Sequence, residues 1–370
     1  MFRIDNHDDS GARAGVLATG HGKVQTPFFM PVATKGTVKT LTHEEVGNLG
    51  FDSVISNALV LYLRPGVETI EQSGGLHSFT GWKKTIFTDS GGFQILNPEF
   101  LKKADEKGVV FRSPIDNSRH TITPEKCIEI QNRMGSDVAM VLDMVIPFGA
   151  SIEENSRAVN MTSDWARRCK EAHKNREQLL FAITQGGTFS KLRDRSTREL
   201  LEIDFDGYGI GGLSIGEPKE VMHQIIKEQN KVLPEDKPRY LMGVGSPVEL
   251  LRAISMGVDV FDSTFPTRNA RHNDAYTFKG EFNISRGKFK NDYSPIEAEC
   301  NCFTCKNHSR AYVHHLLKNK EVTGQVLMTL HNLAFIKNLM TRSREAIVEN
   351  RFNEFKNHTL RGMELGENKK

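Results

Sequence analysis

Short apolar runs recur along the chain, and most of the longer segments between them have the amphipathic pattern of helices. The runs are rich in β-branched and aromatic residues and carry few charges, which is typical of strands buried on both faces. They are Phe28–Ala33, Asp52–Asn57, Thr85–Ser90, Val138–Asp143, Leu179–Gln185, Tyr208–Leu213, Arg239–Val244 and Val258–Ser263. Eight such strands alternating with helices predict an α/β fold, a parallel (β/α)8 TIM barrel. An open, doubly wound sheet is the alternative that this pattern leaves open.

Two of the intervening segments carry clear helix start signals. Residues 123–134 open with an N-cap threonine and a first-turn proline, and their apolar residues follow at roughly helical spacing. Residues 246–255 repeat this arrangement with Ser246 and Pro247, and Gly257 is the expected stop. Both segments are therefore predicted to be helices.

Two polar stretches interrupt the alternation of strands and helices. Residues 102–120 are rich in turn signals, and Gly108–Arg112 with Arg119–Ile122 predict a small hairpin. Residues 275–294 form a second departure after the eighth strand, and the last forty or so residues have an amphipathic helical pattern. We expect a single domain over residues 1–370 that includes an inserted subdomain at about 294–335 and C-terminal helices to 370.

Polar residues stand at the ends of several predicted strands. Asp89, Asp143, Gln185 and Asp262 each follow an apolar run. A barrel would bring such residues together on one face, whereas an open sheet would scatter them along a line. Asp262 is followed by an expected loop with Arg268 and Arg271, and guanidinium groups beside a carboxylate suit chemistry on a phosphorylated polymer. The simpler reading of Asp262 is an aspartate that caps the next turn.

Composition and charge limit the functional classes. The 370 residues are 38% hydrophobic and 26% charged, as in a soluble globular protein. The net charge of +3 permits nucleic-acid binding only if the basic residues gather on one face. The N-terminus lacks the pattern of a signal peptide, and no apolar run approaches membrane-spanning length. Five cysteines, three of them clustered, argue against a disulfide framework and for the cytoplasm.

The cysteine cluster predicts a structural zinc site. Cys300, Cys302 and Cys305 supply three thiols within six residues, one ligand short of a closed tetrahedral Zn²⁺ site. The candidates for the fourth ligand are His308, His314, His315 and His331. His331 is far enough along the chain for an intervening helix to pack and a second helix to return. Spacing alone leaves the choice among these histidines open.

Taken together, these motifs resemble those of the tRNA-guanine transglycosylase family. The resemblance runs from about Gly15 to Phe352. The matching pieces are Thr88-Asp-Ser-Gly-Gly-Phe-Gln94, Thr184-Gln-Gly-Gly187, Gly211-Gly-Leu213, Tyr240-Leu-Met-Gly-Val-Gly245, Phe261-Asp262 with Pro266-Thr-Arg268, and the cysteine cluster with His331. The family has a (β/α)8 barrel with a zinc subdomain. The resemblance implies exchange of guanine at the anticodon wobble position of tRNA for a free 7-deazaguanine base, as in queuosine biosynthesis.

The resemblance also implies a role for individual residues. Asp262 matches the nucleophile, and Asp89 matches the general acid/base. Residues matching the base pocket are Ser90, Phe93, Gln94, Asp143, Gln185, Gly212, Leu213 and Met242. Arg268 and Arg271 match residues that contact the anticodon loop. One structural Zn²⁺ per chain would be bound by Cys300, Cys302, Cys305 and His331, and a homodimer with contacts from the zinc region is implied.

The sequence departs from the family pattern at a few positions. Asn57-Ala-Leu-Val60 stands where the family commonly has Asn-Thr-Tyr-His, so a hydroxyl and an imidazole are missing near the pocket. Phe93 replaces a common tyrosine but keeps the stacking face. Val145 and Ile215 match positions beside the 7-substituent of the base, and enzymes that accept bulky queuine tend to have a smaller residue at position 215. We therefore expect 7-aminomethyl-7-deazaguanine to be the preferred base.

Other functions remain as alternatives. The same exchange could use queuine, or the nitrile base used by the archaeal branch. Archaeal members generally carry extra C-terminal RNA-binding modules, for which this chain leaves no room after His331. A nucleoside hydrolase would use the same aspartates with water as acceptor. A catalytically silent RNA-binding subunit is the last alternative, and the presence of both Asp89 and Asp262 argues against it.

Overall fold

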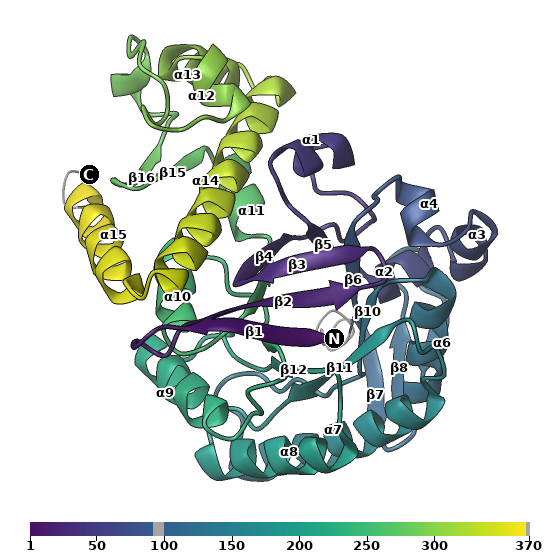
Figure 1. Cartoon of the computed structure of the whole chain (residues 1–370). Helices are drawn as coiled ribbons and strands as arrows, with labels where there is room; N and C mark the ends of the chain where they lie inside the picture. Colours follow the sequence, from purple (N-terminus) through teal and green to yellow (C-terminus); the bar gives the residue numbers. More distant parts are fainter. Residues whose placement is uncertain (92–99, 368–370) are drawn as a thin grey trace.

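The central feature of the fold is a barrel of eight parallel strands (Figure 1). The computed structural model describes residues 1–91 and 100–367. The barrel strands are β4 (Phe28–Pro31), β5 (Ser53–Asn57), β6 (Thr85–Asp89), β10 (Val138–Met140), β11 (Leu179–Thr184), β12 (Gly207–Ile210), β13 (Arg239–Leu241) and β14 (Val260–Ser263). All eight lie within the runs predicted from the sequence or differ from them by one residue, so the (β/α)8 prediction is confirmed.

The two edge strands of the eight-stranded sheet, β4 and β5, meet and close the barrel. A parallel bridge joins Val32 to Ile55. The Ala33 N–H donates to the Ile55 carbonyl at 2.7 Å, and the Asn57 N–H donates to the Thr34 carbonyl at 3.3 Å. Closure removes the alternative of an open sheet and places the carboxyl ends of all eight strands around one rim.

Helices surround the barrel and connect its strands. They are α1 (His43–Asn48), α2 (Ala58–Leu63), α3 (Val67–Gln72), α4 (Leu76–Thr80), α6 (Pro124–Met134), α7 (Ile152–Ala172), α8 (Ser190–Ile203), α9 (Lys219–Asn230), α10 (Pro247–Ile254) and α11 (Phe265–Arg271). The Thr123 side chain caps α6 and the Ser246 side chain caps α10, as the sequence predicts. The expected loop with Arg268 and Arg271 is wrong, because these residues form α11, with Pro266 in its first turn.

A three-stranded antiparallel sheet covers the amino-terminal end of the barrel (Figure 1). Its strands are β1 (Phe2–His7), β2 (Arg13–Thr19) and β3 (Gly22–Thr26). Arg13 on β2 forms a buried ion pair with Asp259, which directly precedes β14, with 2.9 Å between Nε and Oδ1. The sheet is therefore anchored to the end of the barrel opposite the polar strand ends.

A histidine pair reinforces the same end of the barrel. The His21 and His77 rings stack with centroids 3.5 Å apart, and both donate toward Asp137 at 2.8 and 3.1 Å. The backbone N–H groups of His21 and Ile86 also reach the Asp137 carboxylate. Each carboxylate oxygen thus accepts two hydrogen bonds, one from a ring nitrogen and one from a backbone N–H. This cluster is a saturated structural network.

Two insertions extend from the barrel. The predicted hairpin of β8 (Gly108–Arg112) and β9 (Arg119–Ile122) is confirmed, and β7 (Leu101–Asp105) adds a third strand that the sequence pattern did not indicate. The second insertion follows α11 and contains β15 (Asp274–Thr277), β16 (Gly280–Asn283), a 3-10 helix (Gly287–Phe289), α12 (Phe303–Asn307) and α13 (Arg310–Lys318). It has its own small apolar core around Ile284, Phe289 and Val313.

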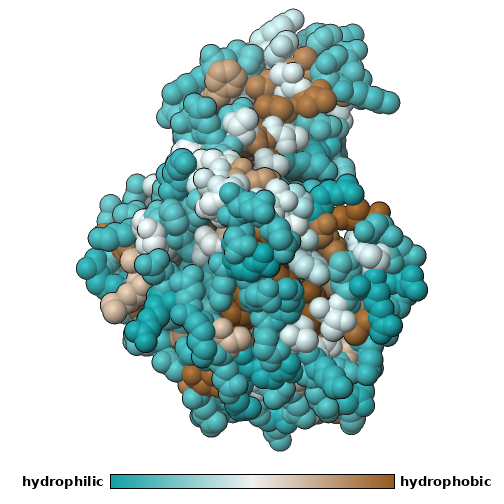
Figure 2. Space-filling model, turned by 90° about the vertical axis from the view of Figure 1, so that its right-hand side faces the viewer, coloured by the Kyte–Doolittle hydropathy of each residue, from teal (hydrophilic) through white to brown (hydrophobic). Residues whose placement is uncertain are grey.

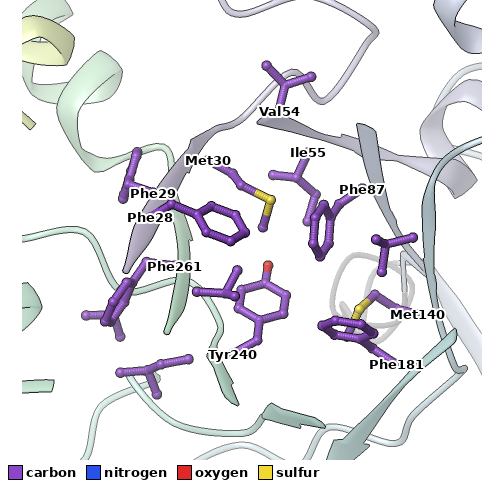
Figure 3. Packing of buried hydrophobic residues seen from close by; sticks show 14 of the residues in the cluster. Phe28, Phe29, Met30, Val54, Ile55, Phe87, Met140, Phe181, Tyr240 and Phe261 are labelled. Carbon is purple, nitrogen blue, oxygen red and sulfur yellow. The ribbon is translucent and has the colours of Figure 1, made fainter. Parts of the chain in front are cut away.

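The chain then returns to the barrel through α14 (Val322–Val348) and ends in α15 (Phe352–Glu367) (Figure 1). Inside the barrel, aromatic and sulfur-containing side chains from facing strands fill the interior (Figure 3). Tyr240 is among them, and its hydroxyl points into the interior. Among the described residues, no helix has the length and apolar character needed to cross a membrane.

Candidate active site

A cavity of about 540 Å³ opens at the carboxyl rim of the barrel. Its walls come from the ends of β6, β11, β13 and β14 and from the turns after β10 and β12. Ten of the residues singled out from the sequence line it, namely Asp89, Ser90, Asp143, Val145, Gly212, Leu213, Ile215, Met242, Asp262 and Arg268. The volume suits a single flat heterocycle with its attached sugar. Convergence on one cavity is the arrangement that the barrel predicted.

Asp262 is held at the cavity wall by two donors to the same oxygen. The Tyr240 hydroxyl donates to Oδ1 at 2.6 Å, and the Gly243 N–H donates to Oδ1 at 2.9 Å. Burial raises the pKa of Asp262, and these two hydrogen bonds oppose that shift. Both of these donors lie on Oδ1, and among the described residues none donates to Oδ2.

Asp89 lies at the end of β6 in the same cavity. Burial raises its pKa to about 7, and the negative charge of Asp262 acts in the same direction. The Gly91 N–H, which donates to Oδ1 at 2.9 Å, opposes the shift. A carboxyl group that titrates near neutral pH can both give and accept a proton under ordinary conditions.

Asp143 and Gln185 form a hydrogen-bonded pair deeper in the site. The Gln185 Nε2 group donates to Asp143 Oδ2 at 2.7 Å, and both side chains are buried. Burial raises the pKa of Asp143 to about 6, and the hydrogen bond from Gln185 opposes this shift. Gln185 is absent from the cavity wall itself and reaches it through Asp143. An acceptor and an amide side by side can read the edge of a planar base.

Three further sequence predictions concern the walls of the pocket. Met242, Val145 and Ile215 line the cavity, the last two as expected for the side beside a base substituent. Phe93 and Gln94 lie outside the described residues. At the departure from the family pattern, Leu59 packs so tightly on Gly91 that a Cβ there would lie 2.3 Å from the Leu59 Cβ.

The two arginines differ in their relation to the cavity. Arg268 on α11 lines it together with Lys219 from the start of α9. Arg271 is absent from its wall, and its Nη1 group donates to the Thr267 carbonyl at 2.8 Å. Partial burial lowers the pKa of Arg271, and the nearby charge of Arg268 adds to the effect. Arg268 and Lys219 thus place two cations on the wall of one cavity, and cations of this kind suit phosphate groups.

The structure brings the predicted metal ligands together. The sulfur atoms of Cys300, Cys302 and Cys305 lie 3.8, 3.8 and 3.3 Å from His331 Nδ1. A tetrahedral zinc with ordinary bond lengths would separate sulfur and nitrogen by about 3.6 Å. His331 Nε2 contacts the Tyr276 carbonyl at 2.8 Å, an interaction that directs Nδ1 toward the sulfurs. These four residues could hold a metal ion. The choice of His331 over the other histidines is thereby resolved.

Sequence reasoning missed two residues with clear positions in the site. Tyr240 belongs to a matched motif but was not singled out, although its hydroxyl contacts Asp262. Glu217 accepts hydrogen bonds from the Ser214 N–H and, at 3.0 Å, from the Ile215 N–H. The sequence signal for Tyr240 was a tyrosine within a short apolar strand. The signal for Glu217 was a glutamate that directly follows a glycine-rich turn.

Comparisons with known proteins show the family to which this chain is similar. A family model described as queuine tRNA-ribosyltransferase matches residues 8–364. A queuine tRNA-ribosyltransferase of Pelotomaculum thermopropionicum is 49% identical over 97% of this chain and 98% of its own length. Proteins of the same name from Thermoanaerobacter pseudethanolicus and Thiobacillus denitrificans are 50% and 48% identical, over 96% and 94% of this chain and 95% of their own lengths.

Proposed function

The chain belongs to the queuine tRNA-ribosyltransferase family, and from this premise we propose that it exchanges wobble guanine in tRNA for 7-aminomethyl-7-deazaguanine. The exchange would pass through a covalent ester between the RNA and Asp262. The observation that carries the proposal is the meeting of Asp262, Asp89 and the Asp143–Gln185 pair at one cavity.

The reaction would proceed in two displacements. Asp262 Oδ2 attacks C1′ of the ribose as the bond from C1′ to guanine N9 breaks, and Asp89 gives its proton to the departing base. The incoming base then gives its N9 proton to Asp89, attacks C1′ and releases the Asp262 carboxylate. Hydrogen bonds from Tyr240 and Gly243 hold Oδ1, so Oδ2 faces the sugar.

The substrate would be the single-stranded anticodon loop, whose unpaired bases can be flipped outward at low cost. Arg268 and Arg271 would contact its phosphates, and Lys219 adds a further cation at the cavity mouth. The flipped guanine and the free base would use the same pocket, between Asp143, Gln185 and the turn at Gly212. Ser90, Phe93, Gln94, Leu213 and Met242 are assigned to this pocket by resemblance.

The 7-aminomethyl group has a matching acceptor in the turn after β12. Glu217, which is not among the residues that line the cavity, accepts a hydrogen bond from the Ser214 N–H. A trans peptide places its carbonyl opposite its N–H, so the Leu213 carbonyl points away from Glu217. Leu213 and Ser214 both line the cavity. A carbonyl directed there can accept a hydrogen bond from a cationic aminomethyl group.

We further propose that residues 294–335 form a structural zinc-binding subdomain within a single barrel domain. Three thiolates and an imidazole close a tetrahedral site without an open position, which is typical of a structural Zn²⁺. Free thiols in the described cysteines also fit a reducing compartment such as the cytoplasm.

A homodimer is proposed from the surface beside this subdomain. A groove of about 930 Å³ lies between α1, α12 and α14, and Leu49, Phe303 and Val326 line it. Phe303 is 57% exposed. Figure 2 shows apolar atoms gathered on the smaller lobe of the molecule, among hydrophilic surroundings. A second copy that covered this groove would bury apolar surface that is otherwise in contact with water.

The covalent intermediate can be trapped directly. Incubation of wild type with tRNA, followed by denaturing electrophoresis, is expected to show an RNA–protein adduct. Asp262→Asn should form no adduct and lose exchange by roughly a thousandfold or more, because the nucleophilic oxygen is gone. Asp143→Asn is the control, since it keeps the nucleophile and should still form adduct. An adduct in Asp262→Asn would refute the assignment.

Two pH profiles should slope in opposite directions. Because burial and Asp262 raise the pKa of Asp89 to about 7, free enzyme loses the acid form above that pH. The kcat/KM for tRNA should therefore fall as pH rises above about 7. Ester formation removes the charge of Asp262, which otherwise raises the pKa of Asp89. The kcat/KM for the incoming base should therefore increase as pH rises and reach its plateau below pH 7. In Asp89→Asn the fall for tRNA should vanish, and persistence of that fall would exclude Asp89 as the acid.

Metal analysis tests the zinc site. Wild-type protein is expected to contain one zinc per chain by mass spectrometry under native conditions. Cys302→Ala should lose this zinc, because the substitution removes one of four ligands and leaves the tetrahedral site open. Cys169→Ala, which removes a buried thiol outside the cluster, should retain it. Zinc-free wild type, or equal zinc loss in both variants, would contradict the proposal.

Competition between free bases tests the preferred substrate. With equal 7-aminomethyl-7-deazaguanine and queuine, nucleoside mass spectrometry should show at least about tenfold more of the former in tRNA, because Ile215 leaves no room for the cyclopentenediol. Ile215→Gly should narrow this ratio, whereas Val244→Ala, elsewhere on the cavity wall, should not. Preferential incorporation of queuine by wild type would overturn the preference. Guanine release without incorporation of either base would indicate a hydrolase.

A further inference from the structure

Arg193 is a buried cation. Among the described residues, all of its hydrogen-bond partners are backbone carbonyls. It lies on α8 with 1% of its surface exposed. Its Nε group donates to the Gly187 carbonyl at 2.7 Å, and Nη1 donates to those of Thr184 and Gly211 at 3.2 and 2.7 Å. Nη2 donates to the Gly212 carbonyl at 3.3 Å. Burial lowers the pKa of Arg193 to about 9, and the charge of Glu217 opposes the shift.

A guanidinium group without a hydrogen-bonded carboxylate is costly to bury. The carbonyls that it binds belong to the last residue of β11 and to the turns after β11 and β12, which carry Gln185 and Gly212. Arg193 thus joins the two turns that contribute to the base pocket. An arginine whose only task was to fill the core could be replaced by an apolar side chain at lower cost.

The direction of these carbonyls determines where the neighbouring N–H groups point. In a trans peptide the carbonyl of one residue and the N–H of the next lie on opposite sides. Arg193 draws the Gly211 and Gly212 carbonyls to its own side, so the N–H groups of Gly212 and Leu213 turn to the other side. The cavity lies there, because Gly211, Gly212 and Leu213 line it and Arg193 does not.

Gly212 makes this arrangement possible. Its φ is +62°, and a left-handed residue lets two successive N–H groups face the same side. A side chain could not replace its hydrogen, since a Cβ would lie 2.5 Å from Gln185 Oε1. The turn therefore presents two adjacent donors, and the guanidinium holds them from behind.

We propose that Arg193 is a positioning residue that aims the N–H groups of Gly212 and Leu213 at the carbonyl oxygen on the six-membered ring of the base. This inference rests on the proposed function, in which a guanine-like base occupies the cavity. Arg193 touches neither the base nor the reacting atoms. Its contribution should appear as affinity for bases that carry that oxygen.

The test compares two bases and two matched variants. Guanine carries the ring carbonyl, whereas 2-aminopurine lacks it. Arg239 is a second buried arginine that donates to a backbone carbonyl, of Leu233 at 2.9 Å, near the opposite end of the barrel. Arg193→Met and Arg239→Met therefore remove comparable buried cations, and only the first removal should disturb the turn at Gly212.

Equilibrium binding of the two bases, measured at a temperature where all variants are folded, is expected to distinguish Arg193→Met from Arg239→Met. Arg193→Met should lose at least about tenfold in affinity for guanine, because one or two hydrogen bonds to its ring carbonyl are misdirected. Its affinity for 2-aminopurine, which lacks that carbonyl, should fall by less than about twofold. Arg239→Met should change both by less than about twofold. Equal losses for the two bases, or unchanged guanine binding in Arg193→Met, would overturn the proposal.

A conservative variant and a kinetic readout complete the test. Arg193→Lys keeps a cation but has fewer donors in a less rigid geometry, so its guanine affinity should lie between those of wild type and Arg193→Met. If Arg193→Met does not fold, Arg193→Lys carries the comparison alone, with a selective loss of guanine affinity expected.

In exchange assays with the Arg193 variants, the KM for the base should rise while the KM for tRNA stays within about twofold. Absence of base incorporation by wild type would refute the proposed exchange separately, because the binding contrast does not depend on turnover.

Discussion

Closure of the barrel between β4 and β5 is the constraint on which the site depends. The Val32–Ile55 bridge joins the edge strands, and the carboxyl ends of all eight strands then form one rim. Asp89 on β6 and Asp262 on β14 are 173 positions apart in sequence, yet both line one cavity. In an open sheet, β6 and β14 would lie near opposite edges. The electrostatic coupling of these two carboxylates exists only because the sheet closes.

That coupling gives the site its chemical character. Each carboxylate is buried enough for its pKa to rise, and the charge of Asp262 contributes to the shift of Asp89. The site resolves the repulsion by giving the two groups different partners. Tyr240 and Gly243 stabilise the charged form of Asp262, whereas at Asp89 burial outweighs the hydrogen bonds from the Gly91 N–H and the Asn57 side chain. The environment thus favours a charged Asp262 beside an Asp89 carboxyl group that retains its proton near neutral pH.

Much of this arrangement could be predicted from the sequence, because burial on both faces makes barrel strands apolar throughout. The same pattern did not indicate β1–β3. In β1 and β3 buried positions are interspersed with exposed ones, and this sheet packs against the end of the barrel. The helix containing Arg268 was missed because Pro266 suggested a loop, although proline is well tolerated in a first helical turn. Arg193 stands among charged residues typical of a solvent-facing helix, and only the tertiary structure shows its four carbonyl partners. Pairings of that kind have no local sequence signature.

The two ends of β14 show how one strand can serve stability and chemistry separately. Asp259 precedes the strand, and its carboxylate is held by two nitrogen atoms of Arg13 and by the Arg239 N–H. Asp262, three residues later, receives two hydrogen bonds from the described residues, and both lie on one oxygen. The Asp259 carboxylate accepts on both oxygens and holds its neighbours in place, whereas the described residues leave Asp262 Oδ2 facing the cavity without a donor of their own. The difference follows from the partners at each end of the barrel, since the two side chains are chemically identical. In a parallel barrel the amino-terminal end can be locked by ion pairs while the carboxyl rim retains reactive groups.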